Sequence, residues 1–170
     1  MHPMRVVRAK GFDYVGMHRY FLTLCTAKRF PAFMSEVVVD PIRTKFLQLA
    51  GDCHFSILAY CFMPDHLHLL VEGMSAAADL RQFVNGAKQS TGYWFKQQYR
   101  KPLWQVGYYD RVLRDGEATL TVVRYVVRNP VRAGLVDDPA KYPFLGCPAL
   151  GLAAALEAIQ FEPDWTGGSG

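Results

Sequence analysis

The chain has 170 residues, of which 51% are hydrophobic and 20% charged, so it can bury a core as one globular domain and is not a disordered chain. Its four cysteines are widely spaced with no C-x-x-C pair, which argues against a disulfide scaffold or a zinc ribbon and favours reduced thiols. The basic N-terminus has no apolar signal-peptide core and no stretch is apolar enough to span a membrane, so we expect a cytoplasmic protein without a membrane partner.

Charge is unevenly distributed along the chain. Residues 1–134 carry 18 Lys and Arg against 10 Asp and Glu, a net +8, whereas residues 135–170 carry 1 against 5, a net −4. A basic body indicates a polyanionic partner such as nucleic acid. Charge alone is equally compatible with an ordinary, mildly basic surface.

Hydrophobic periodicity and turn residues predict seven regular elements. Their order is β-α-β-β-α-β with a further helix, which is the split βαβ or ferredoxin-like pattern of the α+β class. An antiparallel sheet would then carry helices on one face and leave the other face open for a ligand. In chain order the elements are a strand at 20–26, a helix at 35–50, strands at 55–62 and 66–71, a helix at 79–99, a strand within 103–114 and a helix at 117–129.

Each long helix has an apolar stripe that should face the sheet. Pro41 should lie early in the first helix or kink it, and Pro130 should stop the last helix. The predicted core positions are Val38, Ile42, Phe46 and Leu49 in the first helix and Leu80, Phe83, Ala87, Tyr93 and Trp94 in the second.

The sharpest motif is His66-Leu67-His68. Side chains alternate along a strand, so both imidazoles point to one face while Leu67 points to the other. Two imidazoles on one face, two residues apart, can bind one divalent cation. Two polar histidines on a solvated sheet face would give the same pattern, so the pair by itself is not specific.

A second constellation lies near the end of the last helix. Tyr125 and Asn129 are four residues apart and share a helical face, and Pro130 disfavours helix at Asn129, which places the pair in the last turn. A phenol oxygen there could act as a nucleophile and an amide carbonyl as a third metal ligand. Taken without the histidines, the pair is more simply a core tyrosine and a polar residue at a helix end.

These residues belong to three motifs that, in this order, resemble those of HUH-type single-tyrosine transposases, in particular the REP-associated branch. The similarity covers roughly residues 12–145. We therefore assign residues 1–148 to a transposase-like catalytic domain and 149–170 to an Ala-rich segment and tail, with the terminal Gly-Gly-Ser-Gly treated as a flexible end. The motifs are YCFMPDHLHLLV at 60–71, WQVGYYDRVLR at 104–114 and YVVRNPVRAGLV at 125–136.

The resemblance implies an enzyme that cuts single-stranded DNA, with hairpins in its target, and joins itself to the 5′ phosphate through a tyrosine. His66 and His68 match the metal-binding pair, Tyr125 matches the nucleophile, and Asn129 occupies the place of an amide ligand that is glutamine in the insertion-sequence branch. Mg²⁺ or Mn²⁺ suits such a site, because water and phosphate oxygens would complete an octahedral shell. The chain would work as a monomer, or as a homodimer that exchanges tyrosines.

Cations and aromatic rings along the second long helix and beyond it could hold a DNA strand, because cations bind phosphates and rings stack on unpaired bases. Each ring could equally belong to the core and each cation to a solvated face. Tyr108 and Tyr109 are also rival nucleophiles, although they have no partner amide on a helix. The candidates are Arg81, Lys88, Lys96, Arg100, Lys101, Trp104, Tyr108, Tyr109, Arg111, Arg114 and Arg128.

Other functions stay open. A domesticated relative could recognise a DNA hairpin without cutting it. A zinc site could combine the two histidines with Cys61 or Cys53, although the spacing matches no closed zinc pattern. A replication initiator or relaxase would use similar chemistry, but the small size of the chain argues against it. The Ala-rich stretch 150–160 could cap the domain or hold the active site closed.

Overall fold

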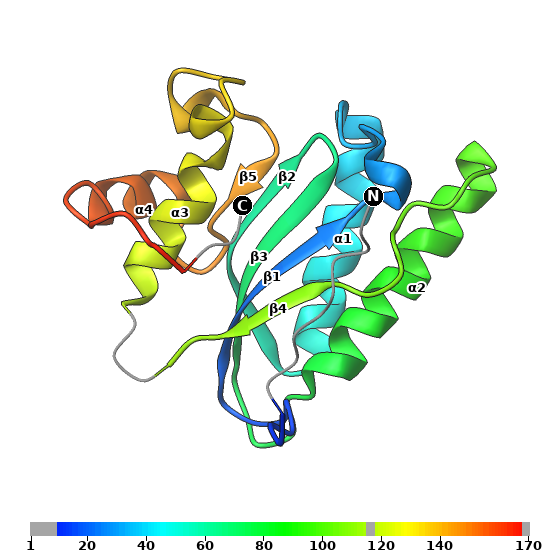
Figure 1. Ribbon diagram of the computed structural model, residues 1–170, viewed down its shortest axis with the longest axis horizontal. Coiled ribbons are helices and arrows are strands. Elements are labelled where there is room, and N and C mark those ends of the chain that lie inside the picture. The colour runs from blue at the N-terminus through cyan, green and yellow to red at the C-terminus, as the bar shows by residue number, and fades with distance from the viewer. Residues whose placement is uncertain (1–9, 115–117, 168–170) are drawn as a thin grey trace.

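The computed structural model describes residues 10–114 and 118–167. A five-stranded antiparallel sheet in the order β4-β1-β3-β2-β5 lies between two helical layers (Figure 1). The order of its elements confirms the predicted ferredoxin-like α+β fold. The elements are β1 (Arg19–Cys25), η1 (Ala27–Arg29), α1 (Glu36–Asp52), β2 (Phe55–Met63), β3 (His66–Gly73), α2 (Leu80–Tyr99), β4 (Tyr109–Val112), α3 (Thr119–Arg132), η2 (Pro139–Lys141), β5 (Leu145–Gly146) and α4 (Leu152–Ala158).

The two faces of the sheet pack against different helices. Tyr20 of β1 contacts Phe55, whose ring stacks on Phe83 of α2. The next residue of β1, Phe21, points the other way and contacts Tyr125 of α3 with ring centroids 5.6 Å apart. Because side chains alternate along each strand, α1 and α2 cover one face and α3 covers part of the other. The second face, predicted to be open, is therefore partly occupied.

The predicted core stripes of the two long helices are partly wrong. In α1 the buried set includes Val39 and Ala50, one residue after the predicted Val38 and Leu49, which are only half-buried. In α2 the side chain of Tyr93 is 69% exposed, because residues spaced three or four apart from Leu80 onward define the sheet-facing side and leave Tyr93 outside it. The buried residues are Val39, Ile42, Phe46 and Ala50 in α1 and Leu80, Phe83, Val84, Ala87, Thr91 and Phe95 in α2.

Helix α3 continues beyond its predicted end. Pro130 lies inside it and the helix ends at Arg132, because a proline this close to the C-terminus removes a single backbone hydrogen bond. The end is closed by Gly134, whose φ of +71° suits the left-handed position of a Schellman cap. The N–H of Leu135 donates to the carbonyl of Pro130 (2.9 Å) and that of Gly134 to Val131 (3.0 Å). Arg132 thereby becomes part of α3.

Three elements beyond α3 were not predicted, the first of them the short helix η2. Strand β5 pairs with β2 through two residues only, which is too short for an alternating pattern, and the Ala-rich stretch forms α4. Residues after α4 return toward β4, where the Arg111 guanidinium donates to the carbonyl of Gly167 (2.8 Å). The strand predicted within 103–114 is limited to the four residues of β4.

Some predictions fall outside the described part of the chain, namely the nature of the N-terminal 1–8 segment, the start of the last helix at Glu117, and the tail at 168–170. Within residues 10–114 and 118–167, no helix is both long enough and apolar enough to cross a bilayer.

Candidate active site

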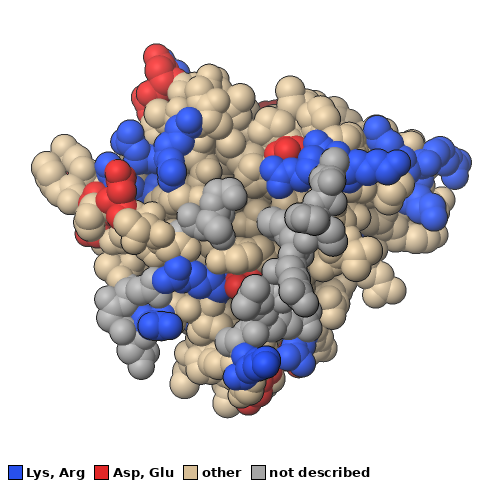
Figure 2. All heavy atoms as spheres, viewed as in Figure 1, with Lys and Arg blue, Asp and Glu red and all other residues tan. Residues whose placement is uncertain are grey.

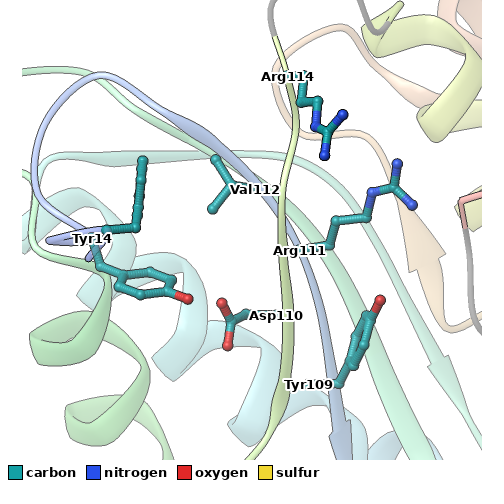
Figure 3. A pocket seen from close by; sticks show the side chains of 7 residues that line it. Tyr14, Tyr109, Asp110, Arg111, Val112 and Arg114 are labelled. Carbon is teal, nitrogen blue, oxygen red and sulfur yellow. The ribbon is translucent and has the colours of Figure 1, made fainter. Parts of the chain in front are cut away.

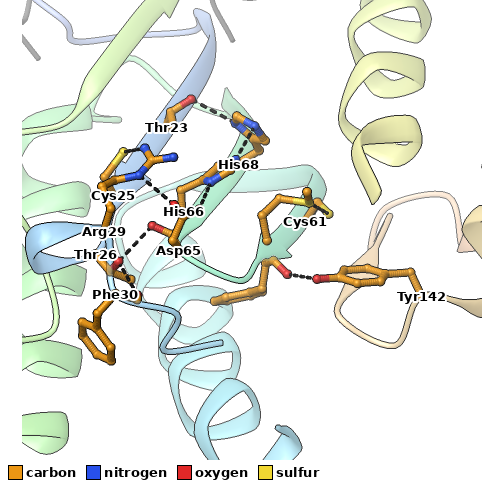
Figure 4. A network of polar contacts seen from close by, with 12 residues as sticks. Thr23, Cys25, Thr26, Arg29, Phe30, Cys61, Asp65, His66, His68 and Tyr142 are labelled. Carbon is orange, nitrogen blue, oxygen red and sulfur yellow. Dashed lines mark hydrogen bonds and ion pairs between the residues drawn. The ribbon is translucent and has the colours of Figure 1, made fainter. Parts of the chain in front are cut away.

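Strand β3 presents two imidazoles to the face of the sheet that α3 covers. The Nε2 atoms of His66 and His68 lie 3.1 Å apart, and the His68 side chain is buried. The other nitrogen of each ring is held by a neighbour: His66 Nδ1 lies 2.7 Å from Asp65 Oδ1, and His68 Nδ1 lies 3.0 Å from Thr23 Oγ1 (Figure 4). Each ring is therefore held in place at its Nδ1 atom, and the two Nε2 atoms face each other.

Asp65, at the β2–β3 turn, connects the histidines to the loop after β1. Its Oδ2 accepts from Arg29 Nε (2.9 Å), and its backbone carbonyl accepts from the N–H and the hydroxyl of Thr26, both at 3.0 Å (Figure 4). Burial alone would raise the pKa of the Asp65 carboxyl, but its bonds to His66 and Arg29 bring that pKa below its usual value. An ionised Asp65 accepts the Nδ1–H of His66, which leaves the lone pair of His66 on Nε2.

Both imidazoles are held neutral. Burial lowers the pKa of His66, and it lowers the pKa of His68 to about 3, with the charges of His66, Arg29 and Arg132 acting in the same direction. Since a folded-state pKa below 6.5 keeps the ring unprotonated at pH 7, both rings are in the form that binds a cation.

The geometry of this pair fits a divalent cation. Two ligand atoms at roughly 2.1 Å from one ion and at right angles to each other are about 3.0 Å apart, which matches the 3.1 Å between the Nε2 atoms. In the described ranges no third His, Cys, Asp or Glu completes a ligand set, so oxygen ligands would have to do so. Such a set of two imidazoles with oxygens suits Mg²⁺ or Mn²⁺.

The cysteines do not favour the alternative zinc site. Cys61 lies opposite His68 on β2, but its Sγ faces Met63 Sδ at 3.7 Å. Burial raises the pKa of the Cys61 thiol well above its ordinary value, and burial also raises that of Cys53. Zinc takes a thiolate, and burial makes that form costly for both thiols in the metal-free protein.

Helix α3 brings Tyr125 next to this pair. The Tyr125 ring lies with its centroid 6.0 Å from that of His68 and is only 6% exposed. One turn later, Asn129 Nδ2 donates to the backbone carbonyl of Tyr125 (2.8 Å). This bond uses the nitrogen end of the amide and leaves Oδ1 uninvolved in it. The two residues share a helical face, as their spacing predicts, and Tyr125 lies next to His68.

Three residues at the site were not predicted. Trp165 covers Tyr125 (5.3 Å between centroids) and Phe21 (5.1 Å). Arg29 reaches the site through Asp65, and the guanidinium carbon of Arg132 lies 4.9 Å from the centroid of the Tyr125 ring. Only Arg132 has a signal in the sequence, because it is seven residues after Tyr125 and so shares its helical face.

Three of the predicted DNA contacts are engaged by other parts of the fold. Tyr108 is 5% exposed, and the indole N–H of Trp104 donates to Thr91 Oγ1 (2.9 Å) on α2. Lys88 Nζ donates to the carbonyl of Gln105 (2.8 Å) and to that of Gly107, while burial lowers its pKa to about 8. These contacts attach the segment before β4 to α2.

The other predicted cations lie at the surface or at its margin. One group of Lys and Arg gathers at the C-terminal end of α2 and another over α3 (Figure 2). Along β4, Tyr109 and Arg111 point to one side of the strand and Asp110 to the other, and all three line a cavity of about 590 Å³ together with Arg114 (Figure 3). The exposed or half-buried candidates are Arg81, Lys96, Arg100, Lys101, Tyr109, Arg111, Arg114 and Arg128.

A ferredoxin-like sheet that carries a His-x-His strand beside a helical tyrosine is the arrangement implied by the resemblance to HUH-type transposases. The family described as "Transposase IS200 like" matches residues 14–129, and this chain belongs to that family. It is 24% identical over 166 residues to a Haemophilus influenzae protein named "Putative REP-associated tyrosine transposase", with 91% of each chain covered.

Two solved structures have the same fold. A REP-associated tyrosine transposase bound to a REP hairpin aligns with a TM-score of 0.69 at 20% identity, over 99% of this chain and 93% of that one. A crystal structure described as a putative transposase from Deinococcus radiodurans aligns with a TM-score of 0.50 at 23% identity, over 71% of this chain and 96% of that one. These relatives confirm the resemblance found in the three motifs.

Proposed function

We propose that this transposase nicks and rejoins single-stranded DNA through a 5′-phosphotyrosine intermediate formed on Tyr125. The observation that carries the proposal is the convergence of the Nε2 atoms of His66 and His68, 3.1 Å apart, next to the buried ring of Tyr125. The imidazole pair suits a divalent cation, and Tyr125 is the one tyrosine on the facing helix. DNA strand transfer needs both.

His66 and His68 would hold Mg²⁺ or Mn²⁺, with Asn129 Oδ1 as a further ligand. When bound, the cation neutralises charge on the scissile phosphate. Asp65 and Thr23 fix the orientation of the two rings. The Tyr125 Oη–P bond forms as the P–O3′ bond breaks, and the phenol proton ends on the departing 3′ oxygen. One phosphoester replaces another, so rejoining requires no ATP.

A single chain supplies the whole set of residues. Tyr125 and His68 of the same molecule are neighbours in the fold, which supports a monomer as the active species over a homodimer that exchanges tyrosines. The alignment with a transposase bound to a REP hairpin supports DNA hairpins as targets. The cations at the end of α2, on α3 and beside β4 would bind the phosphates of such DNA.

The test is to incubate the wild-type protein with labelled single-stranded DNA that carries hairpins from its own genomic flanks, in Mn²⁺. A covalent adduct that peptide mapping assigns to Tyr125 is the expected result, with a fully duplex DNA of the same sequence as the unreactive control. Tight, salt-dependent binding without an adduct would instead support the alternative of a hairpin-binding protein that no longer cuts.

Removing Trp165 should speed this reaction. Its ring covers Tyr125, so DNA reaches the phenol only when the C-terminal segment moves aside. The Trp165 ring is half-buried, so its burial is worth about 1.4 kcal/mol, less than that of a fully buried large ring. Trp165→Ala should therefore raise the rate of adduct formation at subsaturating DNA by roughly tenfold. The exposed Phe161 offers a matched control, because Phe161→Ala removes a ring from the same segment without uncovering Tyr125. A rate equal to or below wild type in Trp165→Ala would contradict this expectation.

A further inference from the structure

Helix α3 carries three polar side chains along one line. Tyr125, Asn129 and Arg132 are spaced four and three residues apart and therefore share one face of the helix. The last of the three depends on the continuation of the helix through Pro130 to Arg132. The transposase chemistry proposed above uses Tyr125 and Asn129, whereas Arg132 has no role in it so far.

The charge of Arg132 lies directly at the nucleophile. Its guanidinium carbon is 4.9 Å from the centre of the Tyr125 ring, and the Tyr125 ring is in turn next to His68. Arg132 itself is exposed at the surface, so a ligand from solvent can reach its guanidinium.

Three other arginines around the site have partners within the chain. Arg29 is paired with Asp65 (2.9 Å), and Arg124 lies 3.5 Å from Asp164. Arg111 donates to the carbonyl of Gly167. In the part of the chain that the structure describes, no carboxylate lies within ion-pair distance of Arg132. A cation at the reaction centre without an internal counter-ion is suited to an anionic ligand.

We propose that Arg132 is a catalytic residue that binds a non-bridging oxygen of the scissile phosphate and stabilises the charge on it during attack by Tyr125. This inference rests on the proposed function. A guanidinium offers a planar pair of N–H donors that matches the oxygens of a phosphoryl group. Acting from the α3 side, Arg132 would complement the charge of a cation held by His66 and His68 while the Oη–P bond forms and the P–O3′ bond breaks.

The experiment compares wild type with Arg132→Gln and Arg132→Lys in single-turnover adduct formation at saturating hairpin DNA in Mn²⁺. We expect Arg132→Gln to lower the rate by about 10²–10³-fold, as loss of one transition-state donor does, with the DNA Kd changed by no more than about threefold. Arg132→Lys keeps the charge but not the paired donors, so its rate should lie between that of wild type and that of Arg132→Gln. The control is Arg43→Gln, on α1 across the sheet, where Arg43 is paired with Asp40.

A second readout separates a contact with the phosphate from a merely structural role. Each non-bridging oxygen of the scissile phosphate is replaced in turn by sulfur, a weaker hydrogen-bond acceptor. The ratio of the wild-type rate to the Arg132→Gln rate should shrink by at least about tenfold for one of the two diastereomers. In that diastereomer the sulfur has already weakened the hydrogen bond from Arg132, so the substitution has less left to remove. An equal ratio for the oxygen substrate and both sulfur substrates overturns the proposal, as does a wild-type rate in Arg132→Gln. If the wild-type protein forms no adduct, the proposed function fails first, and the catalytic role of Arg132 with it.

Discussion

Tyr125→Phe should abolish the covalent DNA adduct, with a loss of at least about 10⁴-fold in rate, because the substitution removes the attacking oxygen and nothing else. The phenylalanine ring can keep the contacts of the tyrosine with Phe21, His68 and Trp165. The free energy of unfolding should therefore change by less than about 1 kcal/mol, and the DNA Kd by no more than about threefold. The measurement is gel separation of labelled adduct, alongside a binding titration and thermal unfolding.

The matched control is Tyr93→Phe, which removes a hydroxyl from an exposed tyrosine on α2. It should form adduct at the wild-type rate. An adduct that persists in Tyr125→Phe and maps to Tyr108 or Tyr109 would transfer the role of nucleophile to the segment around β4.

His66→Ala should have the second largest effect, a loss of about 10³-fold in adduct formation, corresponding to the several kcal/mol that a metal ion contributes at a transferring phosphate. His66 is preferable to His68 for this test because it is only half-buried, so its truncation leaves less of a cavity in the core. Binding of Mn²⁺, measured by calorimetry on the protein alone, should become undetectable, while affinity for hairpin DNA in the absence of metal stays within about threefold.

His54→Ala provides the comparison for that experiment, because His54 is an exposed histidine at the other end of β2. Its Mn²⁺ titration should be that of wild type. If His66→Ala retained wild-type metal binding and cleavage, the pair on β3 would not be the metal site and the chemistry proposed for this face would have to be abandoned.

The parts of the site that could be predicted are those governed by local periodicity. Alternation along β3 was sufficient to place His66 and His68 on one face, and the four-residue spacing was sufficient to pair Tyr125 with Asn129. Arg132 obeys the same periodicity, but a rule that ends a helix before proline excluded it from the helix. The rule failed because Pro130 lies within the last turn, and the Gly134 cap closes the helix after it.

Contacts between distant segments could not be predicted in this way. Trp165 reaches Tyr125 from a segment 40 residues away in the sequence, and no local pattern relates the two. Arg29 reaches Asp65 from a loop in which its own φ is +56°, a conformation that a non-glycine residue rarely adopts. The burial of Tyr108 and Trp104 likewise depends on how the chain before β4 packs against α2, so their aromatic character was compatible with both core and DNA surface.

The acidic end of the chain affects how binding to DNA should respond to salt. Glu162 accepts from Thr121 and Asp164 lies 3.5 Å from Arg124, so this segment brings carboxylates onto the basic helix α3. Trp165 lies edge-on to Tyr125, with the Arg111 guanidinium over its ring. In chemical terms the segment is a short surrogate polyanion, with an aromatic ring in the position of a base and carboxylates in the positions of phosphates. Where DNA displaces this segment, an arginine exchanges a carboxylate of the protein for a phosphate of the DNA. Fewer salt ions are then released than the number of phosphate contacts implies. The carboxylates of this segment thus act as internal counter-ions for part of the basic surface. We therefore expect the affinity for DNA to depend less on ionic strength than the number of basic residues implies.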